Sequence, residues 1–559
     1  EAELIAKAMH TYLWLPEAGT LAEFKDLLGH QLVHPSAGLW SFYHTIDSEV
    51  PTPAEARQMA MALQRAMPHM PVHGPGVPDD RPYFVLPETQ WMPYSWSVNN
   101  VVMGENLHTA LALWQAGDAE QAFTMAKGAL LASMYMGICP GNVGTMNYLD
   151  VYRRESQRDF ADGCGVMSRA IVQGLFGVKP DALAGELRIS PGFPRDWNHA
   201  TLTHPDVHVE FTREGLSDHW SVGSTSAAFR AIKLRVPAIR ERVARVEIND
   251  VESKWRRDDD AVGGPRIELD LPGGRVSTAV IQWSGDAITP MTIARSMAPA
   301  DEPVPAFDWR LPRPSAKCEP VDLSKTFNDR VSSIFAAGKY RSPRSPGDSL
   351  AIPSQGAGAW AGHVNELPAI DDTGLRNVAA KSGGRLVMPN GVPFATPGPG
   401  TSPNICFTSQ WDNYPREVTM PLTGRASRAY LLMAGSTNFM QSRLDNGEVL
   451  VTYTDGLTSR LALRNPTTWW PIEQDYFIDD YQFRYDGSLP PRVNLKTGEI
   501  RLLDEQTFKG KGGPVPGGAA TVLQLPLDAG KELQSLTVRT LANEVVIGLM
   551  AVTLERAEN

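Results

Sequence analysis

Hydrophobic and polar positions change their period along this chain. Up to about residue 180, apolar side chains recur every three to four residues, which is the spacing of amphipathic helices. After about residue 186, short stretches of alternating apolar and polar residues are separated by Gly and Pro, which is typical of β-strands. The sequence therefore predicts a helical region followed by a β-rich region, with a boundary near Pro191.

The helical region carries clear start and turn signals. Thr52-Pro53-Ala54-Glu55 combines a capping box with proline at the first helical position. Ala116-Gly117-Asp118 is a tight turn that joins two helices into a helical hairpin. The long loops 68–97 and 137–161 are where binding and catalytic residues are expected to gather. The periodicity predicts about seven helices, near residues 1–14, 20–29, 36–46, 53–67, 98–116, 119–136 and 162–177.

The β-rich region is punctuated by turn pairs and by two proline-rich stretches, at 296–316 and 388–404. Alternating segments flank the turn pairs, which predicts hairpins of the kind found in β-sandwiches. These turn pairs are Gly273-Gly274, Asn446-Gly447, Asp455-Gly456 and Asp486-Gly487. The predicted domains are a helical catalytic domain at 1–185, a β-sandwich at 186–295, a linker at 296–320 and a second β-sandwich or jelly-roll-like domain at 321–559.

Composition narrows the classes of partner. The chain has 559 residues, of which 42% are hydrophobic, so it is long enough for three domains that each have a core. Its net charge of −11 provides no positive field for nucleic acid or anionic membranes, and neither partner is expected. The four cysteines are far apart and have no metal-finger spacing, so no metal site and no cofactor are expected.

The first residues, EAELIAKAMH, are already in helical phase and carry no N-cap signal. This pattern suggests a chain cut within a helix. We therefore expect a missing N-terminal portion of the same protein, or a partner subunit, to complete the helical domain.

The junction between the two regions resembles a known family. It is similar to the last inner helix and first sandwich strand of six-hairpin (α/α)6 glycoside hydrolases and phosphorylases, such as the α-L-rhamnosidases. The resemblance implies an α+β multidomain fold, in which the C-terminal half of an (α/α)6 toroid is followed by two β-sandwich-like domains. The residues that carry it are Asp162-Gly163-Cys164-Gly165, the segment Ala170 to Val178, the segment Leu187 to Pro194, and Trp197.

A second resemblance is to an uncharacterised group of large secreted bacterial proteins from polysaccharide-degrading organisms. It implies a periplasmic or secreted location and assigns no catalytic residue. The stretches that carry it are Leu13 to Glu17, Ala22 to Gly29, Tyr43 to Glu49 and Trp469 to Asp475.

The richest cluster of candidate chemistry lies in residues 81–100. Glu88 is a carboxylate among rings that can stack on sugars and amides that can hydrogen-bond to them, namely Trp91, Tyr94, Trp96, Asn99 and Asn100. Two explanations remain open: a substrate-binding loop with Glu88 as a catalytic group, or a buried loop whose aromatic residues fill the centre of the ring of helices. Glu105 and His108 follow on one face of the next helix, as a catalytic or a structural pair.

The second cluster lies in residues 142–162. Acids stand beside arginines here, which fits a catalytic carboxylate or a subsite for a uronic acid, and equally a surface salt-bridge belt. The candidates are Asp150 as a catalytic group and Tyr148, Arg153 and Arg154 as binding groups.

A third group is the segment 43–49, where His44 and Asp47 form a His/Asp couple that could serve a hydrolase or a lyase. Its alternative is a structural turn. His30 and His34 have a metal-like spacing but lack the glutamate of a zinc protease motif, so no metal is assigned to them.

These residue types favour a glycoside hydrolase, because glycosidic cleavage needs a pair of carboxyl groups and aromatic platforms. Asp47, Glu88, Glu105 and Asp150 are the candidate catalytic acids. The expected substrate is a plant or algal carbohydrate, and the resemblance suggests one that contains rhamnose or uronic acid. The first alternative is a polysaccharide lyase acting on a uronic-acid glycan, and the second is a non-catalytic glycan-binding protein.

The C-terminal region adds a further aromatic group. Trp411, Trp469 and Trp470 could bind sugars, but adjacent tryptophans in a strand place one ring on each face, so at least one is expected in a core. We predict a structural role for this domain.

Overall fold

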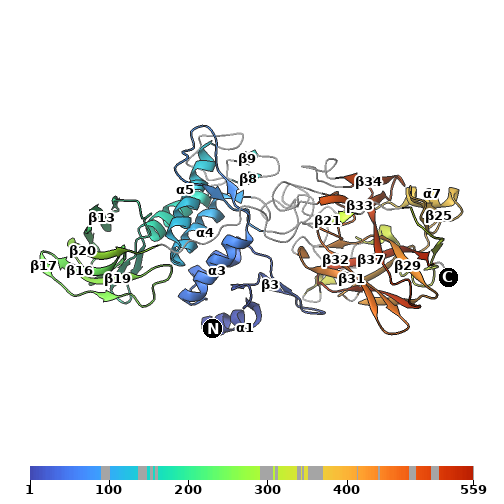
Figure 1. Cartoon of the computed structure of the whole chain (residues 1–559), viewed down its shortest axis with the longest axis horizontal. Coiled ribbons are helices and arrows are strands. Elements are labelled where there is room, and N and C mark those ends of the chain that lie inside the picture. Colours follow the sequence, from blue (N-terminus) through green and yellow to red (C-terminus); the bar gives the residue numbers. More distant parts are fainter. Residues whose placement is uncertain are drawn as a thin grey trace. The chain divides into compact units, whose positions relative to one another are not determined.

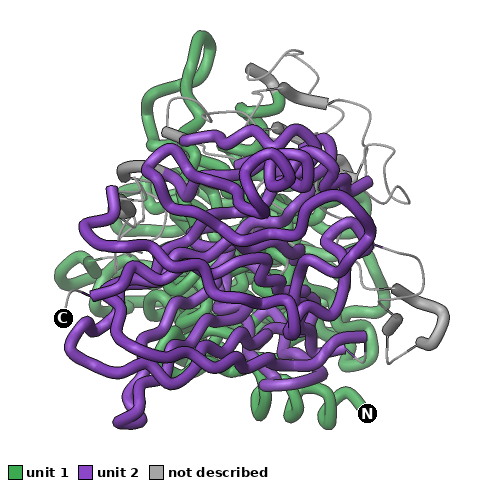
Figure 2. Tube along the Cα trace, turned by 90° about the vertical axis from the view of Figure 1, so that its right-hand side faces the viewer, with its two compact units in different colours: residues 1–22, 37–88, 100–300 green, residues 23–36, 89–99, 301–559 purple. Residues whose placement is uncertain are grey.

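The computed structural model shows an α+β protein that is mostly strands, with seven α-helices in the described residues (Figure 1). It divides into two compact units, which are coloured separately in Figure 2. Unit 1 comprises residues 1–22, 37–88 and 100–300, and unit 2 comprises residues 23–36, 89–99 and 301–559. The described residues are 1–89, 101–135, 148–150, 155–157, 162–289, 306–308, 313–335, 341–342, 345–349, 369–411, 413–437, 441–476, 486–504 and 515–557.

Unit 1 begins with helices that follow the predicted periodicity. The capping box at Thr52 is present, with the Thr52 side chain accepting from the Glu55 backbone and Glu55 accepting from the Thr52 backbone. Gly117 has φ of +76°, which permits the tight turn between α4 and α5. The helices are α1 (Ala2–Leu13), α2 (Leu39–Asp47), α3 (Pro53–Ala66), α4 (Met103–Gln115), α5 (Ala119–Tyr135) and α6 (Asp162–Arg169), which continues as the π-helical turn η1 (Ala170–Leu175).

Short strand pairs connect these helices. They are β1 (Trp14–Leu15) with β2 (Thr20–Leu21), β5 (Met70–Pro71) with β6 (Phe84–Val85), and the three-stranded set β7 (Val101–Val102), β8 (Tyr148–Asp150) and β9 (Glu155–Gln157).

The β-rich part of unit 1 starts near the predicted boundary and contains two sheets. Alternate residues are buried along β13 and β15, so each sheet has one buried face. The five-stranded sheet has the order β10 (Val178–Asp181), β11 (Glu186–Ile189), β15 (Ala231–Pro237), β19 (Arg266–Pro272), β18 (Arg256–Arg257). The six-stranded sheet has the order β12 (His199–Thr203), β13 (Val207–Glu214), β14 (Ser217–Ser224), β20 (Ser277–Ala287), β16 (Arg240–Ile248), β17 (Val251–Glu252).

Close packing explains why the junction motif has glycine at several positions. Trp114 of α4 donates through its indole N–H to the carbonyl of Gly192, at 2.9 Å. A Cβ added to Gly174 would stand 2.3 Å from the Trp114 ring, and one added to Gly177 would stand 2.0 Å from the Ser190 carbonyl oxygen. The π-helical turn and the first strands therefore close tightly around one tryptophan.

Unit 2 is built on a large sheet that has a core on each face. Along β29 (Ala426–Met433), Ala429, Leu431 and Met433 belong to one apolar cluster, whereas Tyr430 and Leu432 belong to the other. The first cluster is closed by a four-stranded sheet, and the second is covered by α7 (Thr373–Lys381) and its neighbouring hairpin. Trp411, Trp469 and Trp470 are all buried, so the prediction that at least one of them lies in a core is confirmed.

The strands of unit 2 run in several sheets. The nine-stranded sheet has the order β21 (Ala306–Asp308), β33 (Asp486–Asn494), β35 (Ala519–Pro526), β29, β37 (Val545–Arg556), β22 (Cys318–Pro320), with β27 (Cys406–Ser409) and β30 (Ser436–Thr437) on β37 and β34 (Ile500–Asp504) on β33. The four-stranded sheet has the order β28 (Glu417–Pro421), β36 (Leu533–Thr540), β31 (Asp445–Tyr453), β32 (Thr458–Arg464). Two-stranded pairs are β23 (Arg341–Ser342) with β24 (Ser345–Ser349), β25 (Arg385–Val387) with β26 (Pro393–Ala395), and β3 (Phe24–Lys25) with β4 (Val33–His34).

Four local predictions from the sequence are wrong. The helix expected near 20–29 is absent, because β3 pairs with β4 and the chain turns back between them with positive φ at Gly29 and Gln31. Asn446-Gly447 is no hairpin turn, because it lies within β31 at a register shift. Asp486-Gly487 is no hairpin turn either, because both residues belong to β33 and pair with β21. Gly273-Gly274 connects β19 to β20, which lie in different sheets, so it closes no hairpin. The predicted turn at Asp455-Gly456 is confirmed between β31 and β32.

A candidate active site on helices α2, α4 and α6

Two helix faces meet at the proposed site. Tyr43 and Asp47 are one turn apart on α2, and Glu105 and His108 are one turn apart on α4. The Tyr43 hydroxyl donates a hydrogen bond to the Glu105 carboxylate. The Tyr43 ring centre lies 4.8 Å from that of His108 and 4.4 Å from that of His44. A carboxylate, a phenol and two imidazoles are therefore gathered within one cluster.

Asp47 is fixed by an ion pair with α6. Arg169 donates to both Asp47 oxygens, at 2.6 and 2.8 Å, and Gln115 donates to one at 3.1 Å. An acid at a helix C-terminus opposes the helix dipole, and the Arg169 charge offsets that repulsion. Partial burial acts to raise the pKa of Asp47, but the hydrogen bonds from Arg169 and Gln115 and the Arg169 charge hold it below its ordinary value.

His108 is kept in its neutral form. Partial burial lowers its pKa below the ordinary value, and the Arg169 charge and the neighbouring His44 ring lower it further. The Asp47 charge acts in the opposite direction but does not reverse the shift. A neutral imidazole beside a phenol can accept a proton near neutral pH.

Glu88 is not part of a helix but lies next to the first residue of α2, and it is buried, with 1% of its surface exposed. Its backbone carbonyl accepts a hydrogen bond from the Leu39 amide, at 2.8 Å. Two residues earlier, the Leu86 backbone exchanges hydrogen bonds with the side chain of Asn106 of α4, at 2.8 and 2.9 Å. The segment that carries Glu88 is thus clamped between the beginnings of α2 and α4.

The backbone of Tyr148 and Asp150 is also held near α4. Val102, which immediately precedes α4, pairs with Tyr148, and Asp150 pairs with Glu155 of β9. The side chains of Tyr148 and Asp150 lie outside the described part of the structure. The other predicted binding residues lie outside the described part of the chain, namely Trp91, Tyr94, Trp96, Asn99, Asn100, Arg153 and Arg154.

Of the candidates named from the sequence, the structure brings Asp47, His44, Glu105 and His108 into one cluster. Sequence reasoning missed Tyr43 and Arg169. Tyr43 had a usable signal, because it is adjacent to His44 and one turn before Asp47 on the same helix. Arg169 had none, because its partner lies 122 residues away.

Two features are absent from the described residues. No group of three or more His, Cys, Asp or Glu side chains among them could hold a metal ion. No helix among them is long and apolar enough to span a membrane.

Comparisons with known proteins give weak similarities. No known family model matches the chain, and no curated protein matches it. Among solved structures, one described as a glycoside hydrolase matches with 11% identity and a TM-score of 0.23, covering 44% of this chain and 46% of that one. A cycloalternan-forming enzyme from Listeria monocytogenes, in complex with a pentasaccharide substrate, matches with 6% identity and a TM-score of 0.15, covering 71% and 25% of the two chains.

A β-porphyranase of glycoside hydrolase family 86, from the human gut bacterium Bacteroides plebeius, matches with 9% identity and a TM-score of 0.15, covering 72% of this chain and 42% of that one. Each match spans less than half of the other protein. These TM-scores are too low to establish a shared fold, so the α-L-rhamnosidase-like junction stays a prediction.

Proposed function

We propose that helices α2, α4 and α6 carry the active site of a glycoside hydrolase, centred on Glu105. The observation that carries the proposal is the hydrogen bond from Tyr43 to the Glu105 carboxylate, beside the neutral imidazole of His108. A hydroxyl that donates to a carboxylate stabilises its charged form. Glu105 is therefore assigned as the nucleophile or general base.

Glycosidic cleavage also needs a proton donor on the other side of the bond, at about 5 Å for retention or about 6.5–9.5 Å for inversion. We assign this role to Glu88 or Asp150. Glu88 is buried and its segment is clamped beside α2 and α4, and Asp150 follows a backbone pair that adjoins α4. Asp47 is assigned a positioning role, because Arg169 already engages both of its oxygens.

The substrate we propose is a plant or algal carbohydrate that contains rhamnose or uronic acid. This proposal goes with the (α/α)6 half-toroid and the two β-sandwich domains that the junction resemblance implies, and with a secreted or periplasmic location. Trp91, Tyr94, Trp96, Asn99 and Asn100 are the proposed sugar-binding residues, with Tyr148, Arg153 and Arg154 at a subsite for an acidic sugar.

One observation favours a polysaccharide lyase as the second candidate. A lyase needs a base that removes a proton next to a uronate carboxylate and a group that neutralises that carboxylate. His108 is neutral and lies next to the Tyr43 hydroxyl, and Arg169 supplies a nearby positive charge. The same cluster thus contains the residue types for either reaction.

The deciding experiment uses the whole protein with rhamnose- and uronate-rich polysaccharides, recording reducing ends and ultraviolet absorbance together. Reducing ends without absorbance, and their loss in Glu105→Gln, support hydrolysis. Absorbance from unsaturated uronate, lost in His108→Gln, supports the lyase. The matched control is Glu3→Gln, which changes an exposed acid in the first turn of α1 and should keep wild-type activity.

Glu88→Gln and Asp150→Asn then identify the proton donor. The variant of the true donor should lose most of its activity, and a good leaving group on an aryl glycoside should restore part of its first step. Full activity in Glu105→Gln would overturn the proposed site. Binding without turnover by the intact protein would favour a glycan-binding protein.

A further inference from the structure

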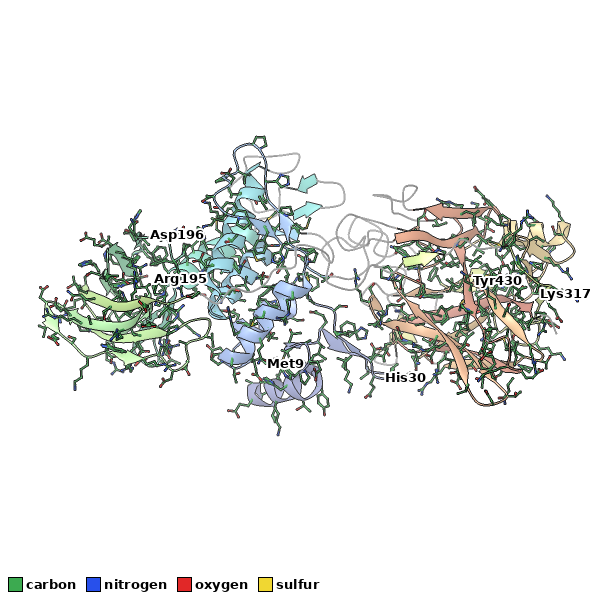
Figure 3. All side chains as sticks on the ribbon, viewed as in Figure 1. Met9, His30, Arg195, Asp196, Lys317 and Tyr430 are labelled. Carbon is green, nitrogen blue, oxygen red and sulfur yellow. The ribbon has the colours of Figure 1, made fainter. Side chains whose placement is uncertain are left out.

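The hairpin formed by β3 and β4 is part of unit 2, although the chain before and after it belongs to unit 1. Residues 23–36 leave unit 1 after Ala22, pair Phe24 with His34 and Lys25 with Val33, and return to unit 1 at Ala37. His30, labelled in Figure 3, lies in the loop of this hairpin. The hydrogen bonds between the hairpin and the rest of unit 2 join residues that are more than 400 positions apart in the sequence.

A buried carboxylate anchors the hairpin. One oxygen of Asp26 accepts from the His34 ring at 3.0 Å and from the Gln441 side chain at 3.4 Å. The other oxygen accepts from the Asn543 backbone amide at 3.0 Å. Asp26 is 5% exposed and His34 is 1% exposed, and the His34 ring stacks on Phe24 at 3.8 Å. Both Asp26 oxygens are thus occupied, and two of the three donors belong to the C-terminal part of the chain.

The surface that receives the hairpin is held by contacts of its own. The Leu541 and Ala542 amides both donate to the Asn446 carbonyl, at 2.9 and 3.0 Å, which sets the backbone just before Asn543. The Asn446 side chain donates to the Gln441 carbonyl, at 2.6 Å, which sets the position of the second donor. The donors that meet Asp26 are therefore placed by residues outside the hairpin.

The hairpin also fits this surface by shape. Leu32 packs against one apolar cluster of unit 2, and Leu28 packs against the other. Gly29 has φ of +62°, and a Cβ added there would stand 2.3 Å from the Gln410 side-chain oxygen. Gln410 cannot easily retreat, because its amide nitrogen donates to the Thr540 carbonyl. Only glycine fits at this point of contact.

We infer that the hairpin 23–36 is a docking element, which holds residues 1–300 to residues 301–559 by non-covalent contacts independently of the peptide linkage at residue 300. The occupant of the receiving surface is this segment of the same chain, and Asp26 is its polar anchor. This inference does not depend on the proposed enzymatic activity.

The test uses the full-length chain with a specific protease site inserted between Ala300 and Asp301. After the folded protein is cut, the wild-type fragments should remain together in size-exclusion chromatography and native mass spectrometry. Asp26→Asn keeps the shape but turns one acceptor into a donor facing another donor, so the fragment dissociation constant should rise at least tenfold. Gly29→Ala should have a similar effect through its contact with Gln410.

The matched control is Gly456→Ala, because Gly456 also has positive φ, of +83°, but an added Cβ would meet no atom within 4 Å. It should lose conformational stability without weakening fragment association. Circular dichroism of each uncut variant shows whether it folds. If Asp26→Asn does not fold, the fragment association of Gly29→Ala decides the result. Separation of the cut wild-type fragments, or undiminished association in the folded variants, would overturn the inference.

Discussion

Asp47 of α2 accepts two hydrogen bonds from Arg169 of α6, at 2.6 and 2.8 Å, and both charges act on His108 of α4. They act in opposite directions, since Arg169 lowers the pKa of His108 and Asp47 raises it. The ion pair is about one third exposed, so its contribution to stability is small, about 0–1 kcal/mol. Its larger effect is on the protonation of the imidazole.

This relationship predicts opposite shifts for two substitutions. Asp47→Asn removes the negative charge and leaves Arg169, so the pKa of His108 should fall further below its ordinary value. Arg169→Gln removes the positive charge and leaves Asp47, so the pKa of His108 should rise. Titration of the His108 ring by NMR measures both. Shifts in the same direction would mean that the two charges do not act on His108 as the geometry indicates.

The Tyr43 hydroxyl provides a second prediction, on activity. Tyr43→Phe removes the hydrogen bond to Glu105 and leaves the ring that contacts His108. We expect kcat to fall by about 10- to 100-fold, because a hydrogen bond to a charged group contributes about 1.5–3 kcal/mol, while KM changes little. Steady-state kinetics on the substrate found in the polysaccharide screen measure both constants. Tyr12→Phe, at an exposed position of α1, is the control and should behave as wild type.

Glu473 of unit 2 provides a third prediction, on pH. It is buried, both of its oxygens accept from the Ser436 hydroxyl, at 2.8 and 3.0 Å, and burial raises its pKa to about 7. Below its ordinary pKa of 4.5, Glu473 is protonated in both the folded and the unfolded state, so its titration does not change the free energy of unfolding. As pH rises from 4.5 to 7, the unfolded state releases its proton first, so the free energy of unfolding falls.

Glu473→Gln removes this titration. The wild type should lose up to about 3 kcal/mol of stability between these pH values, and the variant should not show this loss. Denaturant unfolding at pH 5 and pH 8, followed by a probe in unit 2, gives the difference. Glu417→Gln, at an exposed position of β28, should keep the wild-type dependence. An unchanged dependence in Glu473→Gln would show that another group titrates in this range.

The sequence predicted the elements whose signals are local. The Thr52 capping box and the helical hairpin around Gly117 each depend on a few adjacent residues, and both are present. The change from helices to strands near Pro191 also follows from periodicity, which is a property of each segment by itself. The pairing of Glu105 with His108 on one face was equally predictable from their spacing.

Long-range contacts were not predictable from one sequence. The segment Ala22 to Gly29 has apolar residues at helical spacing, but tertiary contacts of Asp26 with Gln441 and Asn543 stabilise a hairpin instead. Asn446-Gly447 is a strong turn pair, yet it lies inside a strand because that strand is paired on both sides. In each case the deciding partner lies far along the chain.

The junction glycines provide the last prediction, which tests why this motif has its sequence. Gly174→Ala would place a methyl group 2.3 Å from the Trp114 ring, whose indole N–H is already committed to the Gly192 carbonyl. We expect unit 1 to lose about 1–3 kcal/mol of stability, because an overpacked core must shift to admit the group. Faster hydrogen exchange in α4, together with an earlier unfolding transition of unit 1, would measure this loss.

Gly165→Ala is the matched control. Gly165 lies in α6, and an added Cβ would meet nothing within 4 Å. Because alanine favours a helix, this substitution should be neutral or stabilising. Equal effects of the two substitutions would show that backbone freedom, rather than the space beside Trp114, requires glycine at position 174.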